Sequence, residues 1–213
     1  MNVLKPYQRI SDEISQLNKN VTLIVVTKTF SIDHISPLIK HGHLHFGENK
    51  VQEASIKWKQ ILLQNSNLSL HMIGNLQSNK VDEAVSIFSY IHSLDSEKLA
   101  LKLHKAELKY KKNLKYFIQV NLGNENQKSG IALRDLSNFC NFCISKYNLN
   151  IIGLMCLPPI NEDSKKYFVQ LRDLAYQNNF KQLSMGMSND YKLAIESGST
   201  FVRIGSQICG SRS

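Results

Sequence analysis

The 213-residue chain is long enough for one α/β barrel, and its composition, with 42% hydrophobic and 20% charged residues, excludes a disordered or collagen-like protein. Its net charge of +9 comes mainly from lysine, and the basic residues follow no nucleic-acid-reading motif, so we expect no nucleic-acid partner. Because no apolar run approaches the roughly 20 residues of a membrane helix and the first residues lack a signal-peptide pattern, we expect a cytoplasmic protein without a membrane partner.

Eight short runs rich in apolar and β-branched residues recur along the chain and predict β-strands. Several runs are almost continuously apolar, which is typical of parallel strands covered by helices. In chain order the predicted strands are Val21–Thr27, His43–Gly47, Leu68–Ile73, Ser89–Ser93, Lys115–Leu122, Asn150–Cys156, Phe180–Ser184 and Thr200–Gly205.

Segments with helical periodicity separate these runs, and another precedes the first strand. The predicted helices are Tyr7–Asn18, Asp33–Lys40, Lys50–Leu62, Lys80–Phe88, Glu97–Lys109, Leu133–Ser145, Asp163–Gln177 and Asp190–Glu196. Eight strand–helix units predict a single-domain (β/α)8 TIM barrel over residues 1–213. A doubly wound sheet is the alternative, but no strand is followed by a glycine-rich dinucleotide fingerprint. Since few residues follow the eighth strand, we expect a stunted last helix and an N-terminal helix that covers the gap.

A barrel carries its chemistry at the C-terminal ends of its strands. Lys28 follows the first predicted strand, where a lysine amine can act as a nucleophile toward a carbonyl carbon, although a surface lysine on a loop is the alternative. Arg203 is a single cation among the apolar residues of the eighth strand and must face either an internal partner or water.

Small residues with available backbone N–H groups gather after the seventh and eighth predicted strands. Barrels often bind phosphate with these two loops, so this pattern predicts a phosphate site, with helix caps and tight turns as the alternative. The candidate residues are Ser184, Gly186, Ser188, Gly205 and Ser206.

Several histidines and cysteines could suggest a metal site, but their spacing is more typical of turn, strand and core-packing residues. His41, His43 and His45 alternate and could line one face, but such a triplet at a helix-to-strand junction is typical of exposed turn and strand residues. A second group follows helical spacing and indicates core-facing packing: Leu133, Leu136, Cys140 and Cys143. We therefore expect no metal site.

Seven ordered blocks carry a family resemblance. They are VVTKT around Lys28, FGENKVQE (46–53), HMIGNLQSNK (71–80), QVNLGNENQKSGI (119–131), GLMCLPP (153–159), LSMGMSNDY (183–191) and FVRIGSQICGSR (201–212). From about residue 5 onward the chain resembles the pyridoxal phosphate homeostasis proteins, the YggS/PROSC-like family related to the barrel domain of alanine racemase. The resemblance implies a pyridoxal-phosphate barrel of fold type III.

The same resemblance implies roles for individual residues. Lys28 would hold pyridoxal 5′-phosphate (PLP) as an internal aldimine, and Arg203 would face the pyridine nitrogen. His71 would lie at the edge of the cofactor and Asn49 near its face.

The resemblance also implies that Ser188, Gly205 and Ser206 hold the phosphate group. Two positions depart from the family's pattern: Lys50 stands where the family often has tyrosine, and Thr27 stands where serine is common. Both lie beside matched residues, so they bear on how open the pocket is.

Three functions are considered. The first is a monomeric, non-enzymatic PLP carrier that supplies apo forms of PLP-dependent enzymes. The second is an amino-acid racemase of the alanine type, which needs acid/base groups on both faces of the cofactor. In the racemase family the second group is a tyrosine from an extra domain. We expect no such domain here, because the predicted barrel uses all 213 residues. The third is a barrel enzyme for phosphorylated sugars with Glu48 as its base.

Overall fold

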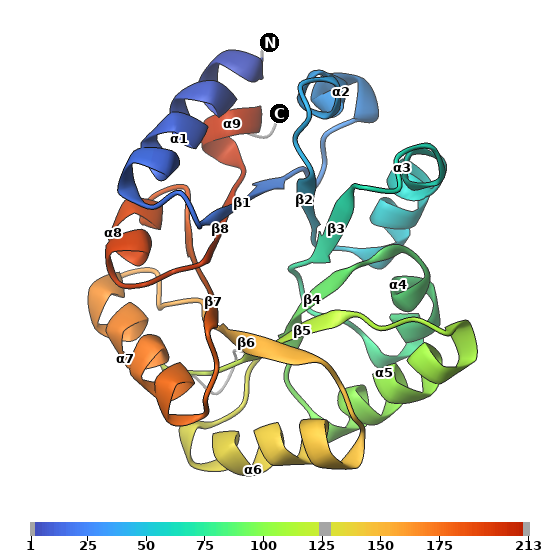
Figure 1. The fold of residues 1–213 in the computed structure, drawn as a ribbon, viewed down its shortest axis with the longest axis vertical. Helices are drawn as coiled ribbons and strands as arrows, with labels where there is room; N and C mark the ends of the chain where they lie inside the picture. The colour runs from blue at the N-terminus through green and yellow to red at the C-terminus, as the bar shows by residue number, and fades with distance from the viewer. Residues whose placement is uncertain (1–2, 124–128, 211–213) are drawn as a thin grey trace.

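The computed structural model describes residues 3–123 and 129–210, so part of the block at 119–131 lies outside the described residues. Eight parallel strands form one closed sheet in chain order, and the last strand pairs with the first (Figure 1). The strands are β1 (Thr22–Val26), β2 (His45–Glu48), β3 (Ser69–Met72), β4 (Tyr90–Leu94), β5 (Lys115–Gln119), β6 (Ile151–Met155), β7 (Gln182–Met187) and β8 (Phe201–Ile204). The predicted (β/α)8 barrel is confirmed.

Helices surround the sheet on its outer side (Figure 1). They are α1 (Leu4–Leu17), α2 (Ile32–Lys40), α3 (Val51–Gln64), α4 (Val81–Ile87), α5 (Glu97–Tyr110), α6 (Leu136–Asn141), α7 (Ser164–Gln177), α8 (Tyr191–Glu196) and α9 (Ser206–Cys209). The last helix is only four residues long, and α1 packs against α8 and α9, as the sequence predicts. Within the described ranges, no helix is long and apolar enough to cross a membrane.

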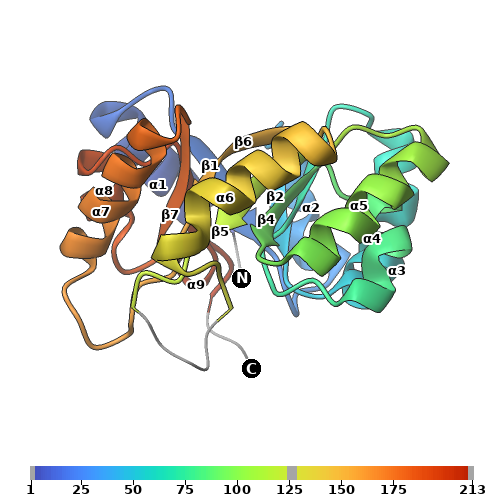
Figure 2. The same ribbon diagram turned by 90° about the horizontal axis from the view of Figure 1, so that it is seen from below.

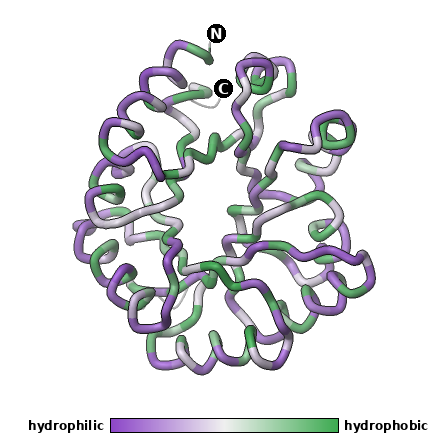
Figure 3. The backbone as a smooth tube through the Cα atoms, viewed as in Figure 1, coloured by the Kyte–Doolittle hydropathy of each residue, from purple (hydrophilic) through white to green (hydrophobic). Residues whose placement is uncertain are grey.

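Local sequence explains where the helices begin and which face they bury. The α5 helix begins where the Ser96 hydroxyl accepts a hydrogen bond from the Leu99 backbone N–H, and it ends at Lys111 in a left-handed conformation. Its buried face includes Leu99 and Leu103, whereas Lys98 is exposed. Figure 3 shows the same alternation of hydrophilic and hydrophobic residues along the other helices.

Two groups of buried residues stabilise the barrel. The larger group lies between the strands and the helices. A smaller group fills the interior of the barrel with residues from five strands: Ile24, Tyr90, Phe117, Met155 and Phe201. The segment after β6 and the short α9 extend from the same end of the barrel (Figure 2), so the C-terminal ends of the strands are gathered there.

The predicted end of the seventh strand at Ser184 was wrong. The β7 strand continues to Met187, and its register against β8 shifts between Ser184 and Met187. Gly186 lies within this shift at a φ of +91°, where an added Cβ would lie 2.5 Å from the Ala194 Cβ. Ser184 therefore belongs to the sheet, not to the loop after it.

The helix predicted over residues 133–145 is divided. A short turn, Leu133–Asp135, precedes α6, and a wider turn, Phe142–Lys146, follows it. Cys140 and Cys143 are buried, as predicted, and burial raises the pKa of each thiol to about 12. Leu133 lies on the first turn and is 40% exposed, so its predicted core position was wrong.

Candidate functional site

A cavity of about 850 Å³ opens at the C-terminal ends of the strands, within the size range of small-molecule sites. Its wall brings together six of the eight candidate residues, from four separate stretches of the chain: Lys28, Asn49, Ser188, Arg203, Gly205 and Ser206. The two remaining candidates, His71 and Ser184, are fully buried and do not line it.

The turn after β1 presents Lys28 to the cavity. Lys28 is half-buried, and the next residue, Thr29, has a left-handed φ of +70°. Such a conformation is unfavourable for a β-branched residue and needs support from its surroundings. Here the Thr29 backbone N–H donates to the Glu53 carboxylate on α3. The α3 helix thus holds the turn that carries Lys28.

A buried carboxylate also holds the end of β1, next to Lys28. Glu48, at the end of β2, is fully buried, and its Oε1 accepts hydrogen bonds from the Thr27 hydroxyl at 2.7 Å and the Trp58 indole at 2.9 Å. Lys57 lies 2.8 Å from the same oxygen and also donates to the Thr27 carbonyl. Glu48 does not line the cavity, so the alternative in which it acts as a catalytic base is wrong; it anchors the residue before Lys28.

Asn49 lies next to Glu48 and lines the cavity. The chain after β3 passes so close to it that a Cβ on Gly74 would lie 2.3 Å from the Asn49 carbonyl oxygen. Only glycine fits this approach. Gly74 therefore fixes the distance between the segments that follow β2 and β3.

The loops after β7 and β8 meet at the opposite side of the cavity. The Ser206 hydroxyl donates to Ser188 Oγ at 3.1 Å, and the Gln207 amide donates to the Ser188 carbonyl at 2.5 Å. Gly205 passes the end of β1, and an added Cβ would lie 3.2 Å from the Val26 Cβ. Two hydroxyls and a glycine thus border one part of the cavity wall, as the sequence predicts.

Arg203 contributes a buried positive charge to the cavity wall. It is 4% exposed, and its guanidinium donates to Ser184 Oγ at 2.6 Å and to the Cys156 carbonyl at 3.1 Å. Burial lowers the pKa of Arg203 to about 10, so the group remains a cation at neutral pH. These contacts answer the question left open by the sequence: Arg203 faces inward.

His71 and Ser184 occupy the barrel interior behind Arg203. His71 contacts His45 and His92, and Ser184 contacts His92 and Arg203. Neither side chain reaches the cavity wall, so a direct role for them at the cofactor has no support from their placement. His92 is a polar residue near the end of the predicted fourth strand, a signal that the sequence shows, but no role at the cofactor was predicted for it.

The histidines at the entry to β2 differ from the sequence expectation. His41 is exposed, but His43 is buried, lies 3.2 Å from the Tyr7 hydroxyl and 2.8 Å from the His45 carbonyl, and its pKa is lowered to about 4 by burial. The expectation of exposure was therefore wrong for His43. In the described part of the chain, no group of three or more His, Cys, Asp or Glu side chains is placed so that it could hold a metal ion.

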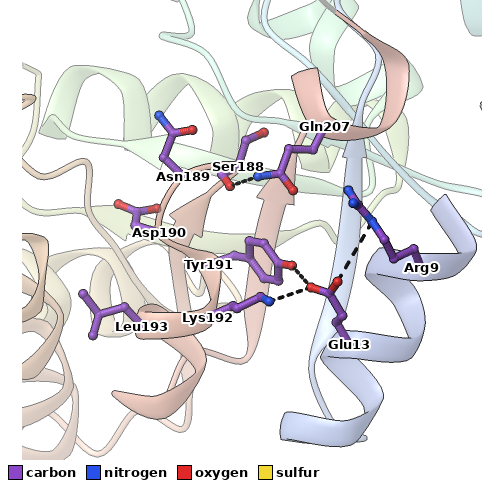
Figure 4. Close-up of a pocket in the computed structure, with 9 residues that line it drawn as sticks. All are labelled: Arg9, Glu13, Ser188, Asn189, Asp190, Tyr191, Lys192, Leu193 and Gln207. Atoms are coloured by element: carbon purple, nitrogen blue, oxygen red, sulfur yellow. Dashed lines mark hydrogen bonds and ion pairs between the residues drawn. The ribbon is translucent and has the colours of Figure 1, made fainter. Parts of the chain in front are cut away.

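A second hollow, of about 440 Å³, lies between α1 and α8 (Figure 4). The Glu13 carboxylate accepts from the Tyr191 hydroxyl and from Lys192 at 2.8 Å, and Arg9 lies 4.0 Å away. These groups are directed at one another in Figure 4, and they join α1 to α8.

Comparison with known proteins identifies the family. Residues 7–213 match the family model of the alanine racemase N-terminal domain. Pyridoxal phosphate homeostasis proteins of Aquifex aeolicus and Helicobacter pylori are 34% and 39% identical, over 99% and 87% of this chain and 95% and 86% of their own lengths. The structure of PipY of Synechococcus elongatus with PLP bound has a TM-score of 0.88 and 33% identity, over 96% of this chain and 100% of that one. This chain belongs to the pyridoxal phosphate homeostasis protein family.

A more distant likeness extends to alanine racemase. The enzyme from Corynebacterium glutamicum has a TM-score of 0.72 at 14% identity, over 96% of this chain but 60% of that one. At this level of identity the likeness shows the shared barrel fold alone.

We predict that the Lys57→Met variant loses about 3–5 kcal/mol of unfolding free energy, because the fully buried Glu48 carboxylate is left without its charge partner. The matched control is Lys109→Met, which removes an exposed ion pair with Asp82 and should have little effect. Urea denaturation measures both variants. Equal losses in the two would contradict an anchoring role for the Lys57–Glu48 pair.

Proposed function

We propose that this protein binds PLP covalently and reversibly in the cavity and acts in PLP homeostasis as a carrier. The observation that carries the proposal is that one cavity wall presents an amine, a buried guanidinium and two neighbouring hydroxyls. The names of the relatives and the PLP-bound neighbour structure support the same ligand. As a carrier, the protein would act in the cytoplasm as a monomer and supply apo forms of PLP-dependent enzymes.

The residues fit the chemical groups of PLP. When bound, PLP supplies an aldehyde that a lysine amine can attack, and Lys28 is the cavity's only lysine in the described lining. Ser188, Gly205 and Ser206 would take the phosphate, since a dianion needs several donors and room for close approach. Arg203 would face the ring nitrogen, and Asn49 would lie near the face of the ring.

The charge on Arg203 favours a carrier over a racemase. A guanidinium beside the ring nitrogen disfavours protonation of that nitrogen and so weakens the ring as an electron sink. Racemisation also needs a second acid/base group on the opposite face. Within the described lining there is no tyrosine, histidine or cysteine, and the one carboxylate, Asp190, accepts hydrogen bonds from the Met187 N–H and the Ser164 hydroxyl.

Lys28→Ala should lose covalent attachment of PLP, because the nucleophilic amine is removed. After incubation with PLP and removal of the unbound cofactor, we expect the variant to keep no visible absorption band and to show no borohydride-fixed mass increase on the peptide that carries position 28. Lys50→Ala, which changes an exposed lysine at the start of α3, should keep both signals. A fixed adduct of unchanged yield in Lys28→Ala would refute the assignment.

Gly205→Val should weaken PLP binding by roughly tenfold or more, since loss of one charge-assisted hydrogen bond to phosphate costs about 1.5–3 kcal/mol. The added side chain would crowd Val26 and the adjoining phosphate loop. Binding of unphosphorylated pyridoxal, measured in parallel, should change little. If both ligands lose affinity equally, the glycine shapes the ring pocket instead; if neither does, this loop is not part of the site.

The PLP-loaded protein should not racemise amino acids. With L-alanine in heavy water, we expect neither steady exchange of the α-proton nor accumulation of the D-isomer, whereas PLP should pass to an added apo-enzyme. NMR follows the proton and chiral chromatography follows the isomers. Catalytic accumulation of D-alanine would overturn the carrier proposal in favour of the racemase.

A further inference from the structure

Three histidines form a continuous hydrogen-bonded row through the barrel interior. His45 Nδ1 lies 3.0 Å from His71 Nε2, and His71 Nδ1 lies 2.9 Å from His92 Nε2. His92 Nδ1 in turn lies 2.8 Å from Ser184 Oγ, the atom that accepts from Arg203. We call His45, His71 and His92 the imidazole row. It begins at His45, the first residue of β2, and ends at His92, which contacts the Ser184 hydroxyl that accepts from Arg203.

The placement of this row is unusual for a barrel interior, which bulky aliphatic residues ordinarily fill. His71 and His92 are fully buried. His71 stacks on Tyr90 with ring centroids 4.1 Å apart, and His92 stacks on Phe117 at 4.4 Å. A buried imidazole is costly unless its nitrogens are hydrogen-bonded, and both nitrogens of each buried ring have a partner within the row or at Ser184.

His45 is the half-buried end of the row, at the N-terminal opening of the barrel. Several groups face it: His71 from β3, Tyr90 from β4, Lys115 from the start of β5, and His43 from the preceding segment. The Lys115 ammonium donates to the Tyr90 hydroxyl at 3.1 Å. Burial, and secondarily the Lys115 charge, lowers the pKa of His45.

Burial also lowers the pKa of His71 and of His92, assisted at His71 by the neighbouring histidines and Lys115 and at His92 by the Arg203 charge. All three rings are therefore neutral at neutral pH, and each carries one proton. A neutral ring has one donor and one acceptor nitrogen, so the proton position on each ring decides that on the next.

Only two orderings of protons satisfy the row. In the first, the Ser184 hydroxyl donates to His92 Nδ1, each ring donates from Nε2 to the next, and His45 Nδ1 accepts. In the second, every bond in the row is reversed: His45 donates from Nδ1, and Ser184 Oγ accepts from both His92 and Arg203, so its own proton must turn elsewhere. A doubly protonated His45 fits only the second ordering, because its Nδ1 then carries a proton.

We propose that the imidazole row couples protonation of His45 at the N-terminal opening to the hydrogen bond between Ser184 and Arg203 in the cavity wall. One proton is gained at His45; His71 and His92 stay neutral and move their single protons from Nε2 to Nδ1. The hydrogen bond between Ser184 and His92 is then reversed: the Ser184 hydroxyl accepts a hydrogen bond from His92 Nδ1 instead of donating one to it. Because a hydroxyl that donates is a stronger acceptor for a second partner, the reversal weakens its bond to Arg203. His92 and Ser184 are thus positioning residues for Arg203.

Imidazole ¹⁵N NMR of the ligand-free protein tests the coupling directly, because protonated and unprotonated nitrogens have distinct shifts. As the buffer is made acidic, we expect the resonances of His71 and His92 to exchange between Nε2–H and Nδ1–H forms together with the titration of His45. In His45→Gln, whose side chain does not titrate, this exchange should be lost. The matched control is His104→Gln, on α5 beside Tyr147 and outside the row, which should leave the exchange unchanged.

Two results would overturn the proposal. If His71 and His92 keep their proton positions until the protein unfolds, the row is a static packing network. If their exchange persists in His45→Gln, the proton enters elsewhere.

Ser184→Ala tests the last link, because it removes the hydroxyl between His92 and Arg203 and keeps all three rings of the row. In this variant His92 should still follow His45, but the guanidinium resonances of Arg203 should stop following either ring. Arg203 resonances that continue to track His92 would exclude Ser184 as the link. None of these measurements needs PLP, so their failure would be distinguishable from failure of the proposed function.

Discussion

Hydrogen bonding between the first and last strands of the barrel is the constraint on which the site depends. The register of β1 against β8 pairs Ile24 with Arg203 and Val25 with Ile204. Closing the sheet in this register brings the turn that carries Lys28 beside the loop that carries Gly205 and Ser206. Residues separated by most of the chain thus share one cavity wall. A shift of the register by one residue would turn Arg203 away from the barrel interior, because successive side chains point to opposite faces of a strand.

Two buried charges make this arrangement specific, and each is compensated differently. Glu48 lies beneath the β1 turn and is matched by the ammonium of Lys57, together with a hydroxyl and an indole. Within residues 3–123 and 129–210, Arg203 forms no ion pair; the Ser184 hydroxyl and the Cys156 carbonyl orient it. Its charge is accordingly directed at the cavity, where an electron-rich ligand atom can complete its hydrogen bonding. The first charge stabilises the scaffold, and the second is available for recognition.

The barrel interior links these functions to the opposite end of the molecule. An aliphatic interior would isolate the cavity from the N-terminal opening, since it offers no polar contact between them. Here aromatic rings support a row of imidazoles that reaches from His45 to Ser184. The same residues therefore serve as packing and as a polar connection to Arg203.

The order of strands and helices, the barrel, and the placement of Lys28 and of the loops after β7 and β8 at one end of it could all be predicted from the sequence. Hydrophobic periodicity and small-residue turns are local properties, and the parallel topology then dictates where strand ends meet. The direction of Arg203, the burial of His71 and Ser184 behind the cavity and the anchoring role of Glu48 depended on the tertiary structure. Each is set by contacts between distant segments: strand alternation offers two faces, and only barrel closure decides which one meets a partner. Lys57 and Trp58 carry no local signal for the same reason, because their partner Glu48 lies on another element.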